Sequence, residues 1–170
     1  TDVITYVISD GNGGTDTAEV EVTVTGSDEG QLITFEDLFD PYFNSFPSGY
    51  HDLNWSWSTL AYNDTWANGI GLLHNSGVVS DDMVAYIQNG DTISSSTGNF
   101  DLESAYLTAY QGDNEILFVS GYDDGVLIDQ QMIILNDTPT YVKFDDAIFD
   151  SVDEVHFIGY SLIMDDLLIA

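Results

Sequence analysis

The sequence predicts an all-β protein, an antiparallel β-sandwich (jelly roll) preceded by a two-strand hairpin. Three observations support this fold class. Short segments of alternating apolar and polar residues recur along the 170-residue chain, turn-forming residues separate them, and no segment has a convincing helical period. Many short strands at such a spacing are typical of antiparallel sandwiches.

The first element is a hairpin within residues 1–26. The segments VITYVIS (3–9) and TAEVEVTVT (17–25) flank the turn-rich sequence DGNGGTD. In the second segment, valines alternate with polar residues at the period of a half-buried strand. Because a lone hairpin is only marginally stable in water, we expect these strands to complete a sandwich whose other strands lie outside this chain.

A polar, glycine-bounded stretch, GSDEG at 26–30, follows the hairpin. We place a linker at 27–31 and a second domain at 32–170. In this domain, six segments between 104 and 169 have the pattern of strands: SAYLTAY, EILFVSGY, VLIDQQMIIL, YVKF, EVHFIG and SLIMDDLLI. The sequence Asp-Asp-Gly between the second and third of them predicts a tight hairpin turn.

The charge balance narrows the possible partners. The chain has 30 acidic residues, one basic residue (Lys143) and a formal net charge of −29. Nucleic acids and anionic membranes are therefore poor partners, because both require Lys and Arg to neutralise phosphate. Repulsion between the carboxylates favours Ca²⁺ as a cofactor, since this cation prefers carboxylate, amide and carbonyl oxygens. The alternative is that the acids only confer solubility on a salt-adapted protein.

The chain contains no cysteine and no apolar run long enough to span a bilayer. We therefore expect neither a disulfide scaffold nor direct membrane insertion. The opening sequence TDVITYV is not a signal peptide, so we expect the chain to be a piece of a longer protein.

The segment TYVISDGNGGTDTAEVEVTVTG resembles the last two strands of the immunoglobulin-like or cadherin-like repeats in giant bacterial surface adhesins. An aromatic strand, the SDGNGGTDTA turn and the alternating valines carry this resemblance. It implies an extracellular, repetitive parent protein that is stiffened by calcium and whose neighbouring repeats are partners of this chain.

Motifs across residues 33–170 resemble a secreted bacterial jelly-roll module that is similar in layout to carbohydrate-binding modules. In order, they are ITFEDL, GYHDLNWSW, SGVVSDDMVAY, FDLESAYLTAY, FVSGYDDGVLI and IMDDLLI. The jelly-roll likeness favours a sugar ligand, and adhesin tips can also hold peptides. Our interpretation is a non-catalytic, calcium-dependent adhesion module that binds a cell-surface glycan or peptide. Where relatives have a compact loop after the tryptophan motif, this chain has TLAYNDTWANGIGLLHNS.

The same resemblance implies a structural Ca²⁺ site between the first and last strands of the jelly roll, which are neighbours in such modules. An acid from each strand shares the ion, which here gives Glu36 or Asp37 with Asp165. Strand alternation places Asp165 and Asp166 on opposite faces and leaves open which of them faces inward. The alternative is two solvated acidic edges that block aggregation.

A further predicted Ca²⁺ site lies in the hairpin turn. Asp10, Asn12 and Asp16 offer carboxylate or amide oxygens, and the glycines between them allow backbone carbonyls to turn inward. The alternative is a plain hairpin turn rich in Asp and Asn.

The three tryptophans all lie in NWSWSTLAYNDTW. Trp55 and Trp57 alternate with polar residues, and we predict that both face the core. Trp66 lies in a polar, turn-rich segment where a ring is less easily buried, which makes it a candidate for stacking on a ligand. The predicted ligand-binding residues come from this segment and from the Asp-Asp-Gly hairpin, and they are Tyr62, Asn63, Asp64, Trp66, Tyr122, Asp123 and Asp124.

The sequence shows no catalytic constellation. His51, His74 and His156 lie on separate segments, without a nucleophile elbow or zinc-ligand spacing. Paired carboxylates carry little information among 30 acids. We therefore predict a non-enzymatic adhesion module at a bacterial cell surface. Two alternatives remain, a calcium-stiffened spacer and an accessory carbohydrate-binding module of a secreted polysaccharide-degrading enzyme.

Overall fold

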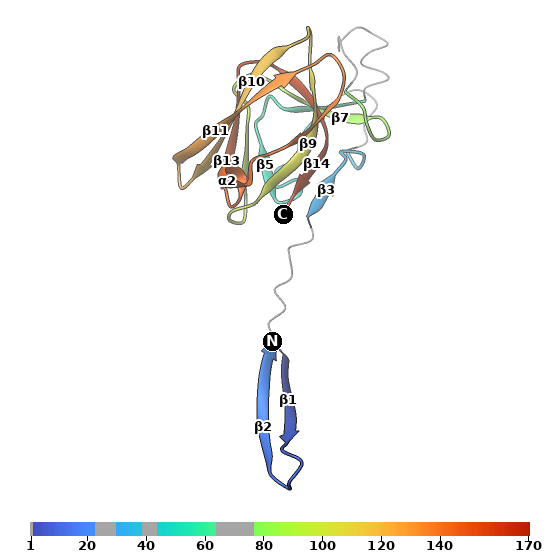
Figure 1. The fold of residues 1–170 in the computed structure, drawn as a ribbon. Coiled ribbons are helices and arrows are strands. Elements are labelled where there is room, and N and C mark those ends of the chain that lie inside the picture. Colours follow the sequence, from blue (N-terminus) through green and yellow to red (C-terminus); the bar gives the residue numbers. More distant parts are fainter. Residues whose placement is uncertain (1, 23–29, 39–43, 64–76) are drawn as a thin grey trace.

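The computed structural model describes residues 2–22, 30–38, 44–63 and 77–170. Within these residues the protein is almost entirely β-structure, in one two-stranded sheet and a sandwich of a five-stranded and a seven-stranded sheet (Figure 1). The predicted all-β fold, an antiparallel β-sandwich preceded by a hairpin, is confirmed. Among the described residues, no helix has the length and apolar character needed to cross a membrane.

The N-terminal hairpin consists of β1 (Asp2–Ser9) and β2 (Thr15–Val22), which pair with each other along their full length. One face of β1 carries Ile4, Tyr6 and Ile8, whose side chains are 56%, 45% and 54% exposed. The hairpin therefore has an apolar face, and the sandwich does not cover this face. That strands of another domain cover this face stays a prediction.

Two antiparallel sheets form the sandwich. The five-stranded sheet has the order β11 (Val126–Leu135), β10 (Glu115–Asp123), β13 (Glu154–Ile158), β8 (Thr92–Ser95) and β5 (Leu53–Trp55). The seven-stranded sheet has the order β12 (Thr140–Lys143), β9 (Leu102–Ala109), β14 (Leu162–Ile169), β7 (Met83–Ile87), β6 (Leu60–Asn63) and β4 (Asn44–Ser45), with β3 (Gln31–Ile33) also paired to β14. The first and last strands of the sandwich, β3 and β14, are thus neighbours, as the family resemblance implied.

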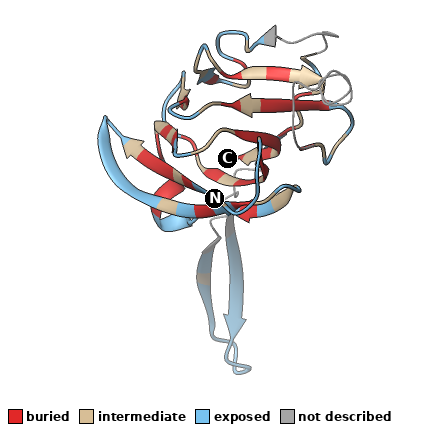
Figure 2. Cartoon of the chain, turned by 90° about the horizontal axis from the view of Figure 1, so that it is seen from above, coloured by how far each residue is buried: buried red, intermediate tan, exposed pale blue. Residues whose placement is uncertain are grey.

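The main hydrophobic core lies between the sheets, and most of its residues are buried strand positions, which are red in Figure 2. Side-chain alternation produces it. In β10, Leu117 and Val119 are fully buried, whereas Ile116 points outward and is 50% exposed. Strand β14 departs from this pattern, because Ile163 on its outer side is also fully buried, in a small cluster with Val84.

The six strands predicted between residues 104 and 169 are all present, and VLIDQQMIIL coincides with β11. The sequence did not predict the one-turn helix α2 (Asp146–Phe149). Asp145 caps this helix, since its carboxylate accepts a hydrogen bond from the backbone N–H of Ala147 at 3.0 Å. A single turn is too short to leave a helical period in the sequence.

The prediction that Trp57 faces the core is wrong. Strand β5 ends at Trp55, and the following turn is closed by a 3.0 Å hydrogen bond from the Thr59 N–H to the Ser56 carbonyl. Because the two-residue alternation stops where the strand stops, Trp57 projects into solvent with 90% of its surface exposed. Trp55 packs, partly buried, against the core as predicted.

Candidate functional site

The tip of the β10–β11 hairpin is built by the predicted turn. Asp123 pairs with Val126, which leaves Asp124 and Gly125 as the two loop residues, with φ angles of 49° and 74°. Two central residues with positive φ are the requirement of a type I′ turn, which Asp-Gly meets at low cost. The turn therefore fixes the directions of the two aspartates at the end of β10.

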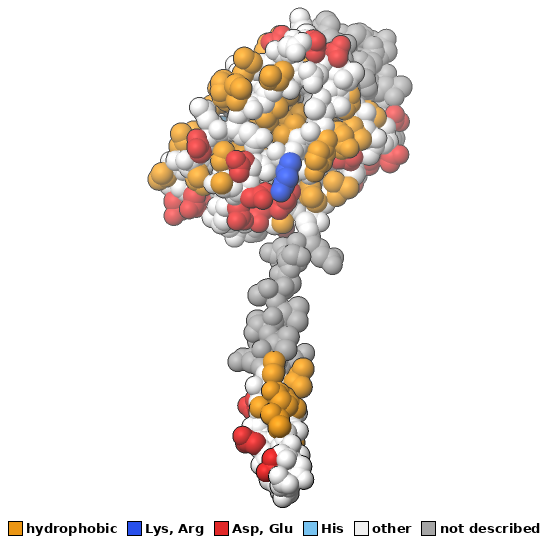
Figure 3. Space-filling view, in the orientation of Figure 1, with side chains coloured by type: hydrophobic (Ala, Val, Ile, Leu, Met, Phe, Trp, Pro, Cys, Tyr) orange, Lys and Arg blue, Asp and Glu red, His pale blue; other side chains and the backbone are white. Residues whose placement is uncertain are grey.

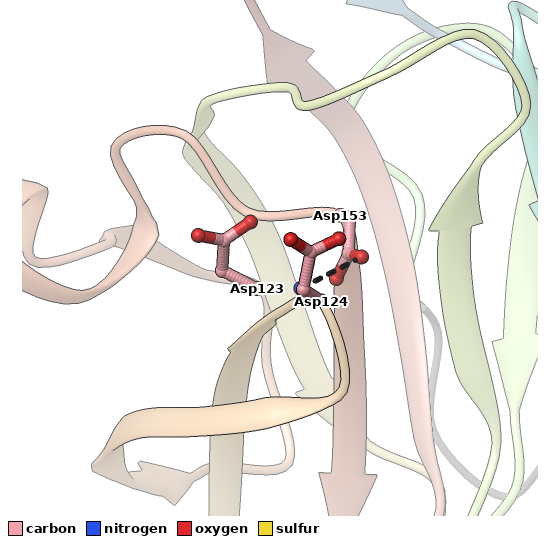
Figure 4. Close-up of side chains that lie close together, drawn as sticks. All are labelled: Asp123, Asp124 and Asp153. Atoms are coloured by element: carbon pink, nitrogen blue, oxygen red, sulfur yellow. Dashed lines mark hydrogen bonds between the residues drawn. The ribbon is translucent and has the colours of Figure 1, made fainter.

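Three carboxylates converge at this tip. Asp123 and Asp124 meet Asp153, which directly precedes β13, and one oxygen from each of the three lies within 4.8 Å of the others (Figure 4). We call these residues the tip cluster. Asp123 and Asp124 are exposed and Asp153 is partly buried. Antiparallel pairing of β10 with β13 brings Asp153 here, because Tyr122 lies opposite Glu154.

One oxygen of the tip cluster has no hydrogen-bond partner among the residues that the structure describes. The Asp124 N–H donates to Asp153 Oδ2 at 3.0 Å, but Asp153 Oδ1 is shielded from solvent and accepts no hydrogen bond from the described residues. An enclosed carboxylate oxygen without a donor carries a desolvation cost that a bound cation would remove.

Neighbouring polar groups hold the cluster in place. The Asn99 side-chain amide donates to Asp123 Oδ1 at 3.1 Å and to the Ser151 carbonyl at 3.0 Å, which ties the tip to the loop before β13. The Asp153 N–H donates to the Tyr122 carbonyl at 3.0 Å. The Tyr122 ring packs on the His156 ring with a centroid distance of 4.3 Å. Carboxylates held in this way offer a hard cation several oxygen ligands without any rearrangement of strands.

The acids predicted between the first and last strands have other partners. Asp165 is fully buried in β14, and its Oδ2 accepts hydrogen bonds from the backbone N–H groups of Val79 at 2.7 Å and Ser80 at 2.9 Å. Its Oδ1 accepts from the Asp166 N–H at 2.8 Å. Burial raises the pKa of the Asp165 carboxyl, and these backbone donors oppose that rise. This environment is that of a structural carboxylate that orders the chain near Ser80.

Glu36 and Asp37 lie just after β3 and are also hydrogen-bonded. Glu36 Oε1 accepts from the N–H groups of Asp82 at 3.0 Å and Met83 at 2.6 Å. The Tyr50 hydroxyl donates to Asp37, and burial together with this carboxylate raises the pKa of Tyr50. No metal-type grouping of acidic or histidine side chains forms around these residues within the described part of the chain. A Ca²⁺ ion shared by Glu36 or Asp37 with Asp165 stays a prediction.

The hairpin turn of the N-terminal sheet is organised by Asp10. Its Oδ1 accepts hydrogen bonds from the N–H groups of Asn12 at 2.8 Å and Gly14 at 2.9 Å, as in an Asp-rich turn. Asp16 Oδ1 accepts from the Thr17 N–H at 2.8 Å. Asp10 and Asp16 line one shallow hollow of about 300 Å³. Calcium binding by Asp10, Asn12 and Asp16 stays a prediction as well.

The remaining predicted ligand-binding residues come from the tryptophan-rich segment. The Tyr62 side chain belongs to a group of tyrosine rings on the outer side of the seven-stranded sheet. The centroid of its ring lies 5.9 Å from that of Tyr86. Burial raises the pKa of Tyr62, and nearby Tyr86 adds to this rise. Asn63 is the last residue of β6. Asp64 and Trp66 lie outside the described residues.

The sequence singled out Asp123 and Asp124 as ligand-binding residues, not as metal ligands, and it did not single out Asp153. Asp153 follows Asp124 by 29 positions in a chain with 30 acidic residues, so no local motif marks it. No family model, curated protein or solved structure matches this chain. The geometry of the described residues is therefore the basis of the functional argument.

Proposed function

We propose that this protein is a non-catalytic, calcium-dependent ligand-binding module displayed at a bacterial cell surface. The observation that carries the proposal is the tip cluster, in which three carboxylates converge and one enclosed oxygen accepts no hydrogen bond from the described part of the chain. The β-sandwich supports it, because such a fold presents rigid strands whose end loops can hold ions and ligands.

Calcium is the cation that suits the tip cluster best. The site offers carboxylate oxygens and no thiol or imidazole among its three members, which favours a hard cation over zinc or copper. Its partly exposed aspartates leave room for the waters and additional oxygens that complete the large coordination shell of Ca²⁺.

The charge of the chain adds to this preference. Lys143 is the only Lys or Arg of the chain, and its Nζ lies 3.2 Å from Asp146 Oδ1. The hydrogen bond that Lys143 donates to Asp146 raises the pKa of the lysine. On the face of the sandwich in Figure 3, acidic side chains lie next to the lysine on one side and hydrophobic side chains on the other. Because no basic side chain is left to offset the tip carboxylates, a divalent cation relieves their mutual repulsion.

The proposed ligand is a cell-surface glycan or peptide, and the neighbouring repeats of an adhesin are the proposed partners. One observation favours a spacer as a second candidate function. The hairpin exposes Ile4, Tyr6 and Ile8 on one face, which is expected where a chain continues into an adjoining domain. A spacer and a binding module share the calcium site and differ only in the ligand.

Thermal unfolding with calcium and with EDTA tests the metal. At a calcium concentration about 100-fold above Kd, the ion stabilises the folded state by about 2.7 kcal/mol. For a chain of this size we expect EDTA to lower Tm by about 5–10 °C. Asp153→Asn should abolish the difference between the two conditions, whereas Asp137→Asn, which changes an exposed acid in the loop after β11, should preserve it.

The stability of the metal-free variant sharpens the test. Without calcium, Asp153→Asn removes one of three repelling carboxylates, so its Tm in EDTA should equal or exceed that of the wild type. Identical melting curves of the wild type in calcium and in EDTA would refute calcium dependence.

A further inference from the structure

Trp57 is the most solvent-exposed of the large hydrophobic residues in the described part of the chain, with 90% of its surface accessible. The next most exposed, Val7 and Val126, reach 67% each. Tryptophan has the largest apolar surface of any residue, and it is enriched at the energetic centres of binding surfaces. An exposed indole on a folded sandwich is therefore a candidate ligand-binding residue.

Trp57 borders a hollow of about 510 Å³ on one side of the sandwich. Both sheets end here, the seven-stranded sheet with β4 and the five-stranded sheet with β5. The hollow, which we call the Trp57 hollow, is lined by Ser45, Phe46, Pro47, Ser48, Asn54, Trp55 and Trp57. Its volume lies within the range of small-molecule sites.

Two of the aromatic rings that line the Trp57 hollow pack on each other and on the core. The Phe46 and Trp55 rings stack with a centroid distance of 4.3 Å and an angle of 18° between their planes. Phe35, which is fully buried, contacts both rings edge to face, at 5.7 Å from Phe46 and 5.8 Å from Trp55. The Trp55 indole N–H donates to the Tyr50 carbonyl at 3.4 Å. A ligand would thus meet a preformed aromatic surface and lose little affinity to ordering the protein.

The chemistry of the lining selects the kind of ligand. None of the seven lining residues is ionisable, although the chain as a whole carries a net charge of −29. The lining combines aromatic rings with the hydroxyls of Ser45 and Ser48 and the amide of Asn54, which is exposed on β5, the edge strand of the five-stranded sheet. Pyranose rings match this combination, because their C–H faces pack on aromatic rings while their hydroxyls exchange hydrogen bonds with amides and hydroxyls.

We propose that the Trp57 hollow is the sugar-binding site of this module and takes an uncharged pyranose, with Trp57 as the stacking platform and Asn54 as a hydrogen-bonding partner. Acidic sugars are disfavoured because the net charge repels them and no basic residue lines the site. The inference rests on the proposed ligand-binding function, but none of the three tip-cluster carboxylates lines the hollow.

Saturation-transfer NMR and titration calorimetry on the calcium-loaded protein test this assignment. The probes are the methyl glycosides of β-D-glucose, α-D-mannose and β-D-galactose, with glucuronate as an anionic probe and choline as a cationic one. We expect at least one neutral glycoside to bind. Trp57→Ala should weaken this binding about tenfold or more, as for a central binding residue, and Asn54→Ala should weaken it less. Tyr141→Ala removes an exposed aromatic ring at the opposite end of the seven-stranded sheet and should leave the affinity unchanged.

Three results would overturn the assignment: no glycoside binds at high millimolar concentration, Trp57→Ala binds as well as the wild type, or choline or glucuronate binds better than every neutral glycoside. Repeating the titration in EDTA separates the two proposals. If glycoside binding depends on Trp57 but Tm is the same in calcium and in EDTA, the sugar site is supported and the calcium site is refuted. A calcium-dependent Tm without glycoside binding supports the calcium site and refutes the sugar site at the Trp57 hollow.

Discussion

Two acidic regions of this sandwich place carboxylates in opposite environments. In β14, Asp165 is fully buried, and three backbone N–H groups donate to its two oxygens. At the β10–β11 tip, Asp123 and Asp124 are exposed, and Asp153 has an enclosed oxygen that accepts no hydrogen bond from the described residues. The first carboxylate already has the donors it needs, whereas the second group still needs positive charge.

The difference teaches that burial and acidity alone do not identify a metal site. A carboxylate saturated by backbone donors gains little from a cation, because binding one would require breaking hydrogen bonds that are already made. Three carboxylates that lie close together, with one enclosed oxygen that accepts no hydrogen bond from the described residues, gain both ligation and relief of repulsion from a cation. Substitutions in the two regions should therefore respond differently to calcium.

The largest expected effect is on Asp165. Asp165→Ala leaves the N–H groups of Val79, Ser80 and Asp166 without their acceptor in partly buried hydrogen bonds, at about 1–3 kcal/mol for each donor. We expect a loss of about 4 kcal/mol in the free energy of unfolding, measured by urea denaturation. Asp137→Ala, at an exposed loop position, is the matched control and should change stability by less than about 0.5 kcal/mol.

Measuring Asp165→Ala with calcium and with EDTA distinguishes a structural role of Asp165 from a metal-binding role. If Asp165 only orders the chain, the cost of Asp165→Ala is the same in calcium and in EDTA. A cost that largely vanishes in EDTA would instead make Asp165 a calcium ligand, as the family resemblance implied.

The tryptophans should give the next largest effect. Trp55 packs against the core and stacks on Phe46, so Trp55→Ala should cost about 3 kcal/mol through lost burial and a cavity. Trp57 is 90% exposed, and Trp57→Ala should stay within about 1 kcal/mol of the wild type. Thermal melts of the two variants decide the matter, and equal destabilisation would show that Trp57 packs in solution.

The smallest effect concerns pH. Because burial raises the pKa of Asp165 in the folded state, the folded protein holds this proton more tightly than the unfolded chain does. The associated stability is complete below the ordinary Asp pKa and is lost as pH rises through the raised value. Carboxyl-carbon NMR should show Asp165 titrating above the ordinary Asp value, and Asp165→Asn should remove this part of the pH dependence. A titration of Asp165 below its ordinary value would mean that its backbone donors outweigh burial.

Sequence patterns were sufficient where a local rule operates. Alternation located the strands from β9 to β14, and Asp124-Gly125 predicted the turn that aims the tip aspartates. Local patterns failed where a strand stops or bends. Trp57 was assigned to the core because alternation continued in sequence beyond the end of β5.

The features that the sequence did not predict depend on contacts between residues that are distant in sequence. The pairing of β14 with β9 shifts register between Asp165 and Leu168, so alternation alone could not decide which acid faces inward. Asp153 joins the tip only through the register of β10 with β13. A residue brought to a site by strand pairing carries no mark in its own segment.

The most direct measurement of the central claim is a calcium titration by calorimetry on the wild type, Asp153→Asn and Asp165→Asn. Asp153 belongs to the tip cluster with the unpartnered oxygen, and Asp165 belongs to the saturated region. The tightest calcium-binding event of the wild type should persist in Asp165→Asn and disappear in Asp153→Asn. An event that survives in Asp153→Asn and is lost in Asp165→Asn would place the calcium between the first and last strands and contradict the site at the hairpin tip.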